Sequence, residues 1–415
     1  MIILSGADLV LPDRVISGGS LILEHDRIVE IRPPGVSSPA GSPHVRLADH
    51  YIVPGFIDVH VHGIEGCDTL DGAEAVETIA ARLPRYGVTA FCPTTVACPP
   101  AMLRQLLAAV RQARGAGRTA SARVLPAHLE SNFINPEFRG AQPASCLRHP
   151  PTFSLSADVS FSKVRPAPAD VAEAAEFTAG DVLAEIERAA SEVGIVTLAP
   201  ELPGAIGLVE HLVARSHRVS LGHSGASFEQ ALAGVAAGAR HATHLFNRMP
   251  PLHHRDPGLA GAILRSEEVA AELICDGLHV HPAMARIAIA AKGPARVMAI
   301  TDGTAGAGLP PGARARLGGQ EIHVGDAAAY LPDGTLAGST LTMDRAFRLL
   351  VEVVKLPLVT AAFACATTAA RELRLPDCGE LAPGAIADLA VLDRRFRVVR
   401  TYVGGELVFS AEPGA

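Results

Sequence analysis

The sequence predicts an α/β fold: a (β/α)8 barrel of the TIM type, joined to a small β-sandwich that both ends of the chain build. Eight apolar β-like runs fall between residues 56 and 300, and stretches with helical periodicity separate most of them. Short β-like segments bounded by Gly, Pro and Asp occupy both ends of the chain. Neither end could bury a core alone, so the two ends are expected to pair.

The apolar runs alternate with amphipathic segments, and this alternation predicts parallel strands buried on both faces. Eight such units predict a closed barrel. The strand-like runs are residues 56–61, 88–93, 123–129, 195–199, 218–221, 241–245, 269–275 and 297–300. The helical segments between them include residues 73–86, 101–114, 171–193, 205–216, 228–237 and 282–291.

Two further segments follow a different pattern. A Gly- and Pro-rich stretch, residues 305–338, is expected to contain a β-hairpin, and a helix is expected after it at about residues 341–354. Residues 133–169 have no clear period and many Pro and Ser residues. Because they follow the carboxyl end of a barrel strand, we expect a lid or binding loop in preference to a plain excursion.

The β-sandwich strands are expected at residues 1–4, 8–11, 20–23 and 27–31, and again at 388–392, 397–402 and 406–409. The predicted domains are therefore residues 1–53 for the first part of the sandwich, 54–378 for the barrel, and 379–415 for the second part of the sandwich.

Composition narrows the class of protein. The chain has 415 residues, of which 48% are hydrophobic and 19% charged, which provides for a large core and excludes disorder. The net charge of −7 without a long basic run argues against nucleic acid or an anionic membrane as a partner. No apolar run reaches the roughly 18 residues of a membrane span. The seven cysteines are scattered and form no C-x-x-C pair, which indicates a reduced, cytoplasmic protein.

Acidic and histidine side chains gather where the predicted strands end, which is where barrels of this type build their chemistry. His60 and His62 lie two residues apart on the first strand, so both imidazoles face the barrel axis. Four other strand ends add N and O donors that favour a divalent metal, with zinc or another first-row ion expected. These four are Glu130, His223, His244 and Asp302.

The residues leave the number of ions open. Glu130, His223 and His244 could hold one ion with an open position for water. His60 and His62, with Glu130 or Asp302 bridging, could hold a second. Asp302, on the last strand, could take a proton from a metal-activated water and pass it to a leaving amine. The alternative is that Asp302 only caps the turn that follows it.

The motifs resemble a known family. PGFIDVHVHG at 54–63 is similar to the signature of the amidohydrolase superfamily, and PGAIADLAVLD at 383–393 resembles that superfamily's return to its sandwich. Within it, five stretches resemble the N-acetylglucosamine-6-phosphate deacetylases, in order along almost the whole chain. They are HLESNFINPEFRGAQ at 128–142, LGHSGAS at 221–227, THLFNRMPPLHHRDPG at 243–258, CDGLHVHP at 275–282 and GTLAGSTLTM at 334–343.

The resemblance implies Glu130, His223 and His244 as metal ligands and Asp302 as general base and acid. It implies hydrolysis of the acetamide of an N-acetylamino sugar phosphate, and a homodimer. Residues 250–257, with two His and an Arg, could project toward the partner subunit of such a dimer. It also implies that Asn247, Arg255 and His279 reach the sugar phosphate. The other substrate contacts expected are Ala141, Gln142, Arg248 and the closing segment Leu336, Ala337 and Gly338.

Three departures from the family pattern lie near the expected substrate. Ser131-Asn132 stands where the family has Gly-Pro, Gln142 where it has His, and Arg248 where it has Ala. The predicted metal ligands and acid–base carboxylate are unaffected. A deacetylase of a different acetamido sugar or N-acyl amine therefore stays an alternative. A non-catalytic barrel that binds sugar phosphates is a further one.

Overall fold

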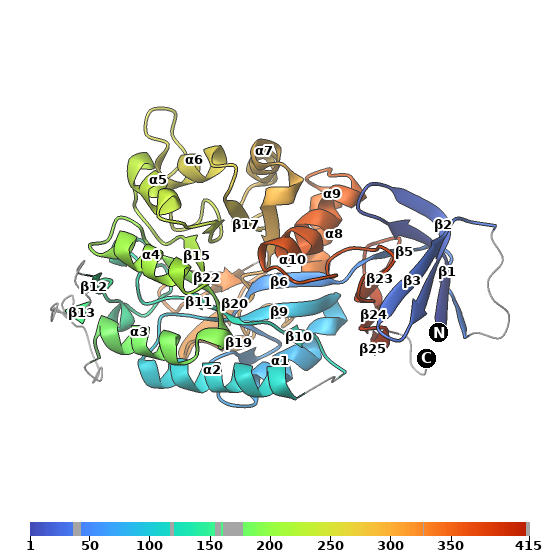
Figure 1. The fold of residues 1–415 in the computed structure, drawn as a ribbon, viewed down its shortest axis with the longest axis horizontal. Helices are drawn as coiled ribbons and strands as arrows, with labels where there is room; N and C mark the ends of the chain where they lie inside the picture. The colour runs from blue at the N-terminus through green and yellow to red at the C-terminus, as the bar shows by residue number, and fades with distance from the viewer. Residues whose placement is uncertain (36–42, 117–119, 154–158, 161–176, 327, 412–415) are drawn as a thin grey trace.

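The computed structural model describes residues 1–35, 43–116, 120–153, 159–160, 177–326 and 328–411. Two parts are visible in Figure 1: a barrel covered by helices, and a β domain in which strands from both ends of the chain lie side by side. No helix among these residues is long and apolar enough to cross a membrane.

The barrel confirms the predicted fold class. Its parallel strands are β6 (Phe56–Val61), β9 (Val88–Thr95), β11 (Ala127–Glu130), β14 (Val193–Leu198), β15 (Arg218–Leu221), β16 (His241–Ala242), β17 (Ala270–Ile274) and β18 (Val297–Ile300). A parallel bridge between Val61 and Gly303 closes the barrel from its last strand to its first. The third predicted run, 123–129, is interrupted, and its first part is the short strand β10 (Arg123–Val124) beside β9.

Helices surround the barrel where the periodicity predicts them. They are α1 (Ala75–Arg82), α2 (Pro100–Gly115), α3 (Ala179–Arg188), α4 (Ala205–Ala214), α5 (Phe228–Ala236), α7 (Pro282–Lys292) and α8 (Met343–Glu352). Helix α3 begins at Ala179 because Thr178 and Asp181 form a capping box there. The start of the expected helix at 171–176 lies outside the described residues. Helices α9 (Leu358–Ala362) and α10 (Thr368–Glu372) follow α8.

The β domain is one eight-stranded sheet that joins the two ends of the chain. Its main path runs β25 (Glu406–Ser410), β24 (Val398–Val403), β23 (Leu389–Asp393), β5 (His50–Pro54), β1 (Ile2–Val10), β2 (Val15–Glu24) and β3 (Arg27–Arg32), with β4 (His44–Arg46) beside β1. It encloses a core separate from that of the barrel, to which Leu4, Leu389 and Tyr402 contribute. The domain boundaries at 53/54 and 378/379 stay predictions.

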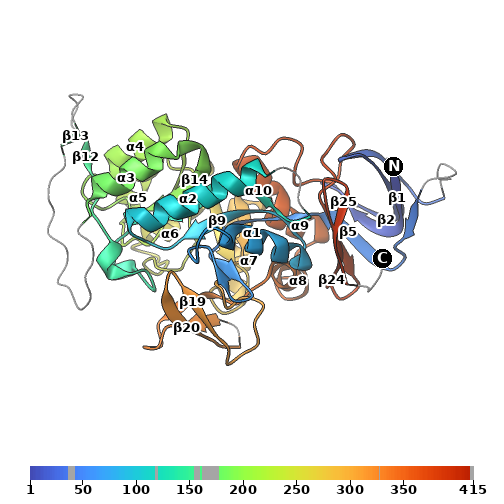
Figure 2. The same ribbon diagram turned by 90° about the horizontal axis from the view of Figure 1, so that it is seen from below.

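The expected hairpin is present as part of an antiparallel sheet of four strands. The sheet consists of β19 (Arg314–Leu317), β20 (Gln320–Val324), β21 (Ala328–Tyr330) and β22 (Leu336–Ser339). Figure 2 shows β19 and β20 projecting from the side of the barrel. The bond from Ser339 N to Asp302 O, 2.9 Å, ties β22 to the end of β18. The sheet thus brings its last strand to the carboxyl end of the barrel.

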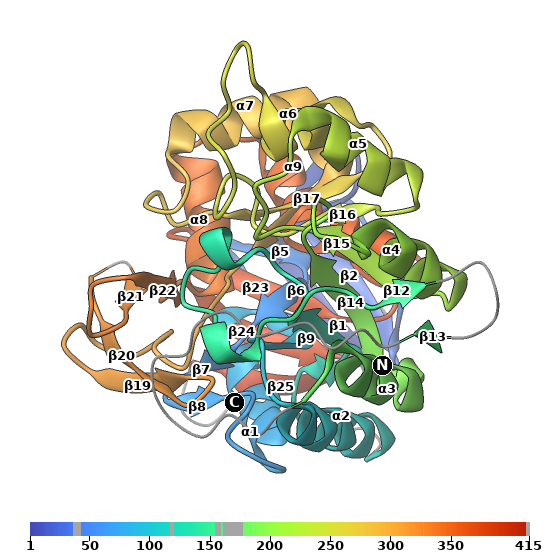
Figure 3. The same ribbon diagram turned by 90° about the vertical axis from the view of Figure 1, so that its left-hand side faces the viewer.

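The β domain leads directly into the amino end of β6, so the carboxyl ends of the barrel strands open on the opposite side. Figure 3 looks onto that side, where the teal segment after β11 crosses in front of the strands. Residues 133–153 of the expected lid lie there, with short turns at Pro136–Phe138 and Ala144–Cys146. The rest of the predicted 133–169 segment, apart from residues 159–160, lies outside the described residues.

Candidate metal centre and active site

Six predicted side chains meet at the carboxyl ends of the barrel strands, and all six are buried. His60 lies on β6 and Glu130 ends β11, while the others follow strand ends directly: His62, His223, His244 and Asp302. The backbone at three of them is left-handed, with φ of 47° at His223, 27° at His244 and 49° at Asp302. Non-glycine residues rarely adopt this conformation, and it clusters at functional sites, where it turns side chains inward as the strand ends.

Glu130 is the centre of the first group. Its Oε1 lies 2.7 Å from His223 Nε2 and 2.8 Å from His244 Nε2, and the two nitrogens are 3.0 Å apart. Two imidazole nitrogens at this distance repel each other unless a proton or a cation lies between them. One carboxylate oxygen and two imidazole nitrogens are donors that zinc and other first-row metals prefer.

His60 and His62 form the second group. Their Nε2 atoms are 3.2 Å apart, and Asp302 Oδ1 lies 3.4 Å from the first and 3.2 Å from the second. Glu130 is also close, with Oε1 3.8 Å from His60 Nε2 and Oε2 3.6 Å from His62 Nε2. Because Glu130 lies between the groups, the geometry accommodates one ion or two.

Hydrogen bonds turn the ligating nitrogens toward the centre. His223 Nδ1 donates to Phe138 O at 2.8 Å, and His60 Nδ1 donates to Glu272 Oε2 at 3.0 Å. Each bond leaves the Nε2 lone pair facing the cluster. Phe138 belongs to the segment that follows Glu130, so the expected lid segment supports a member of the cluster.

The charges of the cluster favour a cation. Burial alone would raise the pKa of Glu130 and of Asp302, but the surrounding imidazoles outweigh burial and lower both values. Burial alone would lower the pKa of His60, but Asp302, Glu272 and Glu130 raise it to about 10. The carboxylates that would hold a proton on His60 would hold a metal cation equally well, so the residues fit a divalent ion.

A cavity of about 510 Å³ opens over this cluster. Among the residues expected to contact substrate, seven line it: Ala141, Gln142, Asn247, Arg248, His279, Leu336 and Gly338. Ala337 is buried beside them and does not line the cavity. Arg255 is exposed on the 250–257 loop, outside the cavity of its own chain.

Comparisons with known proteins agree with this arrangement. The amidohydrolase family matches residues 51–408. The chain belongs to the amidohydrolase family. It is 32% identical to N-acetylglucosamine-6-phosphate deacetylase of Bacillus subtilis over 97% of this chain and 95% of that protein. It is 33% identical to N-acetylgalactosamine-6-phosphate deacetylase of Escherichia coli O157:H7 over 86% of this chain and 87% of that one.

Among solved structures, the chain resembles a variant of N-acetyl-D-glucosamine-6-phosphate deacetylase from Mycobacterium smegmatis in complex with N-acetyl-D-glucosamine-6-phosphate. The TM-score is 0.85 at 30% identity, and the match covers 99% of each chain.

Within this amidohydrolase, the departures from the family pattern have different surroundings. Ser131 Oγ donates to Thr197 O at 2.5 Å, and Asn132 Nδ2 donates to Cys98 O at 2.9 Å and to Cys146 O at 2.7 Å. Neither residue lines the cavity. These two substitutions therefore hold the backbone after β11 and do not alter the cavity wall directly.

Gln142 and Arg248 do alter the cavity wall. Gln142 Nε2 donates to Glu130 Oε2, and its Oε1 accepts from Ala97 N at 2.6 Å. Arg248 Nη2 donates to Leu336 O at 3.2 Å. The first substitution places an amide on the carboxylate at the centre of the cluster. The second places a guanidinium across the cavity, next to the segment expected to close on substrate.

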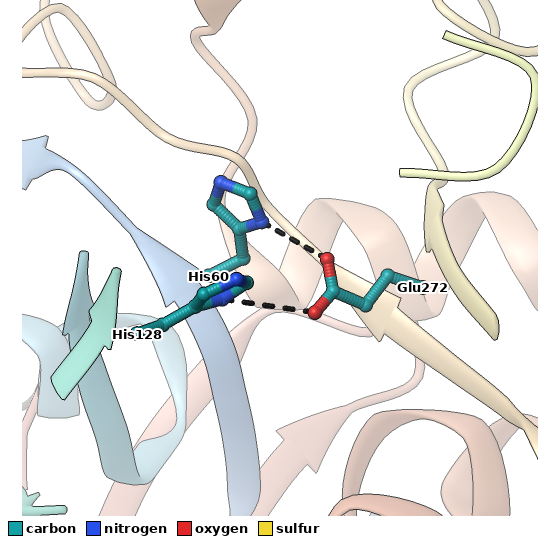
Figure 4. A group of neighbouring side chains, drawn as sticks. All are labelled: His60, His128 and Glu272. Atoms are coloured by element: carbon teal, nitrogen blue, oxygen red, sulfur yellow. Dashed lines mark hydrogen bonds and ion pairs between the residues drawn. The ribbon is translucent and has the colours of Figure 1, made fainter. Parts of the chain in front are cut away.

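Two amidohydrolase residues beneath the cluster escaped sequence analysis. Figure 4 shows Glu272 facing both His60 and His128, with its Oε1 3.7 Å from His128 Nδ1. His128 Nδ1 donates to Val59 O at 2.9 Å, and its Nε2 lies 2.8 Å from Thr197 Oγ1. A signal was available: Glu272 interrupts the apolar run 269–275, and His128 lies two residues before Glu130, on the same face of its strand.

Proposed function

We propose that this amidohydrolase removes acetate from an N-acetylamino sugar phosphate, with N-acetylglucosamine 6-phosphate as the first candidate. One observation carries the proposal: Asp302 lies beside two histidines, with Oδ1 3.2 Å from His62 Nε2, at the floor of a cavity large enough for a sugar phosphate. The curated relatives above, named as deacetylases of such compounds, support it.

Glu130, His223 and His244 would hold one divalent metal, for which we propose zinc. His60 and His62, with Glu130 or Asp302, would hold a second. When bound, a divalent metal supplies a Lewis acid that polarises the scissile carbonyl and lowers the pKa of water. The remaining chemistry belongs to the side chains of the chain.

Asp302 moves the proton. The His60 and His62 imidazoles keep its pKa low, so its carboxylate is ionised at neutral pH and can act as a base. As the water oxygen bonds to the amide carbon, Asp302 takes the proton that water loses. It then gives this proton to the amine nitrogen as the C–N bond breaks, which releases acetate and the amino sugar phosphate.

The cavity wall binds the rest of the substrate. Asn247, Arg248 and His279 supply polar groups to the lining of the cavity, to which Leu336 and Gly338 also belong. His279 is oriented by Asp276, whose Oδ2 lies 2.5 Å from its Nδ1. We propose that Arg255, whose planar guanidinium suits a phosphate, acts across a homodimer, because residues 251–256 are exposed and Arg255 does not line the cavity of its own chain.

We also propose a cytoplasmic location. All seven cysteines are free in the structure, and five of them are buried. This usage is typical of proteins kept in a reducing compartment.

The test of the catalytic role is Asp302→Asn. The substitution keeps the size of the side chain but removes the base, so we expect kcat to fall by at least about 100-fold. Acetate release from N-acetylglucosamine 6-phosphate and bound metal are measured together, with exposed Asp13→Asn as the matched control. A kcat near that of the wild type in Asp302→Asn would overturn the proton-transfer role.

The alternative is a different acetamido sugar phosphate. It is favoured by Gln142 and Arg248 in the cavity wall and by the likeness to the N-acetylgalactosamine-6-phosphate deacetylase at similar identity. Measurements of kcat/KM for N-acetylglucosamine and N-acetylgalactosamine, each with and without the 6-phosphate, separate the candidates. Our proposal expects the highest value for N-acetylglucosamine 6-phosphate and a large loss without phosphate.

A further inference from the structure

A cavity of about 1150 Å³ lies at the amino ends of the barrel strands, on the side opposite the cluster of Glu130, Asp302 and the four histidines. Its walls include residues from α1 and α2, the starts of β10, β14 and β15, residues 373–375 after α10, and Val403 and Glu406 of the β domain. It shares no lining residue with the cavity over Asp302. We call this one the lower cavity and the cavity over Asp302 the upper cavity. The lower cavity is therefore a separate site, which the proposed deacetylation does not use.

The wall of this cavity is positively charged, although the chain as a whole has a net charge of −7. Two carboxylates line it, Glu77 and Glu406. Against them stand five arginines: Arg114, Arg123, Arg218, Arg240 and Arg374. A concentration of one sign of charge in a concave surface attracts ligands of the opposite sign.

Only one of these guanidiniums has an acidic partner among the described residues: Arg123 binds Asp388 through two hydrogen bonds of 3.1 and 2.7 Å. Arg114 donates to Ser191 O, and Arg240 donates to Val235 O and Ala239 O. Backbone carbonyls satisfy these donors but carry no net charge, so these bonds do not neutralise the two guanidiniums.

The guanidinium groups of Arg218 and Arg374 have neither a hydrogen bond nor an ion pair within the described part of the chain. Burial lowers the pKa of Arg218, and the positive charge of Arg374 lowers it further. Glu372 offsets this in part, but it is already engaged by Arg296 at 2.6 Å and His241 at 3.4 Å. The two guanidiniums line the same cavity and repel each other, and an anion bound between them would be attracted to both.

The rest of the wall suits a small polar molecule. His217 is 5% exposed, and its Nδ1 donates to Val193 O at 3.0 Å, which leaves Nε2 as an acceptor with no partner among the residues that the structure describes. A buried acceptor of this kind costs free energy, which a ligand hydroxyl reaching that wall would recover. Val213, Val219 and Leu375 add apolar surface against which a ring can pack.

We propose that this cavity binds a phosphate monoester of a small hydroxylated molecule, of the size of a hexose phosphate. A phosphate monoester is favoured over a carboxylate because it carries nearly twice the negative charge and offers three oxygens to several guanidiniums. The volume accommodates a ligand of this size. The proposal rests on the charge and shape of the lower cavity and is independent of the deacetylase assignment.

The experiment is a calorimetric titration of the full-length protein with glucose 6-phosphate. It compares the wild type with the double variant Arg218→Gln/Arg374→Gln. The number of equivalents bound per chain is expected to be one smaller in the double variant, whether or not the upper cavity also binds this ester. Equal stoichiometry and affinity in the two proteins would overturn the proposal.

Arg314→Gln is the matched control, because Arg314 lies on the β19–β22 sheet with a side chain that is 73% exposed. This control is expected to bind glucose 6-phosphate as the wild type does. If it lost as much binding as the double variant, the loss would follow from net charge alone, which would contradict a defined site. The single variants Arg218→Gln and Arg374→Gln cover the case in which the double variant misfolds. Each is expected to weaken the lower-cavity affinity by about tenfold, the loss of one charge-assisted hydrogen bond.

Two further titrants test the ligand class. Glucuronate keeps the hexose ring but replaces the phosphate by one carboxylate, and glucose carries no charge. We expect glucose 6-phosphate to bind at least about tenfold more tightly than glucuronate at the Arg218-dependent site, and glucose not to bind there. Equal affinity for glucuronate and the phosphate ester would contradict the phosphate assignment.

Discussion

At the scale of single residues, Glu272 lies beneath the cluster and contacts two of the histidines there. It is fully buried on β17, and the imidazoles of His60 and His128 both face it. Its carboxylate fixes the tautomer of His60 and contributes to the negative field that favours a cation. Carboxylates in this position commonly change metal affinity by 10- to 100-fold when they are replaced.

We therefore expect Glu272→Gln to weaken metal binding by about 10- to 100-fold, while the amide keeps an acceptor for His60 Nδ1. Competition with a chromogenic chelator measures the affinity, and exposed Glu321→Gln is the matched control. Thermal unfolding of the metal-free proteins separates a loss of fold from a loss of affinity. An unchanged affinity would show that Glu272 only fills the barrel.

The residues of the cluster were predictable where they interrupt a pattern. His60 interrupts an apolar run, and His62 and Asp302 follow apolar runs; a parallel barrel must bring such strand ends together. The support from Phe138 was not predictable, because it is a backbone carbonyl supplied by a segment with no period. The position of Arg255 outside the cavity was also not predictable, because a resemblance of motifs carries no information about the direction in which a loop extends.

At the scale of elements, the sequence predicts the strands and helices well where their apolar period is strong. It misses α6 (Gly258–Arg265), an eight-residue helix with two glycines and no side-chain cap at its start. It divides β1 in two, because Gly6 resembles a turn; in the sheet, Gly6 has φ of 85° and lies at a shift of register within one strand. Both errors arise where tertiary packing overrides a local signal.

The junction of α6 and α7 gives a pH-dependent prediction. Lys292, at the end of α7, donates to Ile263 O at 3.0 Å and to Ser266 O at the end of α6. Burial lowers its pKa from 10.5 to about 8. Below pH 8 the lysine is charged in both the folded and the unfolded protein, and the full cost of burying its charge lowers the free energy of unfolding. Between about pH 8 and 10.5 the unfolded chain binds more protons than the folded one, so the free energy of unfolding rises with pH.

The comparison is with Lys292→Met, which cannot titrate. Urea unfolding at pH 7 and pH 9.5 should show the difference in free energy of unfolding, wild type minus variant, moving in favour of the wild type at the higher pH. A difference that stays constant, or that moves the other way, would mean that the pKa of Lys292 is not lowered in the folded protein.

At the scale of the whole molecule, the barrel and the β domain are joined by more than the chain that connects them. Asp388, just before β23, accepts from Arg123 of the barrel and from Gly404 N at 2.7 Å, while its backbone O accepts from Gly55 N at 2.9 Å. One buried carboxylate thus links the return of the chain to the start of the barrel. These contacts give a structural reason for the Asp in the motif at 383–393.

A double-mutant cycle tests the link between the two parts. Asp388→Ala leaves a half-buried guanidinium unpaired and is expected to cost about 2 to 3 kcal/mol, below the range for fully buried pairs because Arg123 stays partly exposed. Arg123→Ala and the double variant complete the cycle, with an expected coupling of about 1 to 2 kcal/mol. Chemical unfolding followed by circular dichroism gives the three values. Because the backbone bond from Gly55 N to Asp388 O still ties the start of the barrel to the β domain in each variant, we expect each variant to unfold in one transition at lower denaturant. Two separated transitions in the wild type would contradict this coupling and show that the barrel and the β domain fold independently.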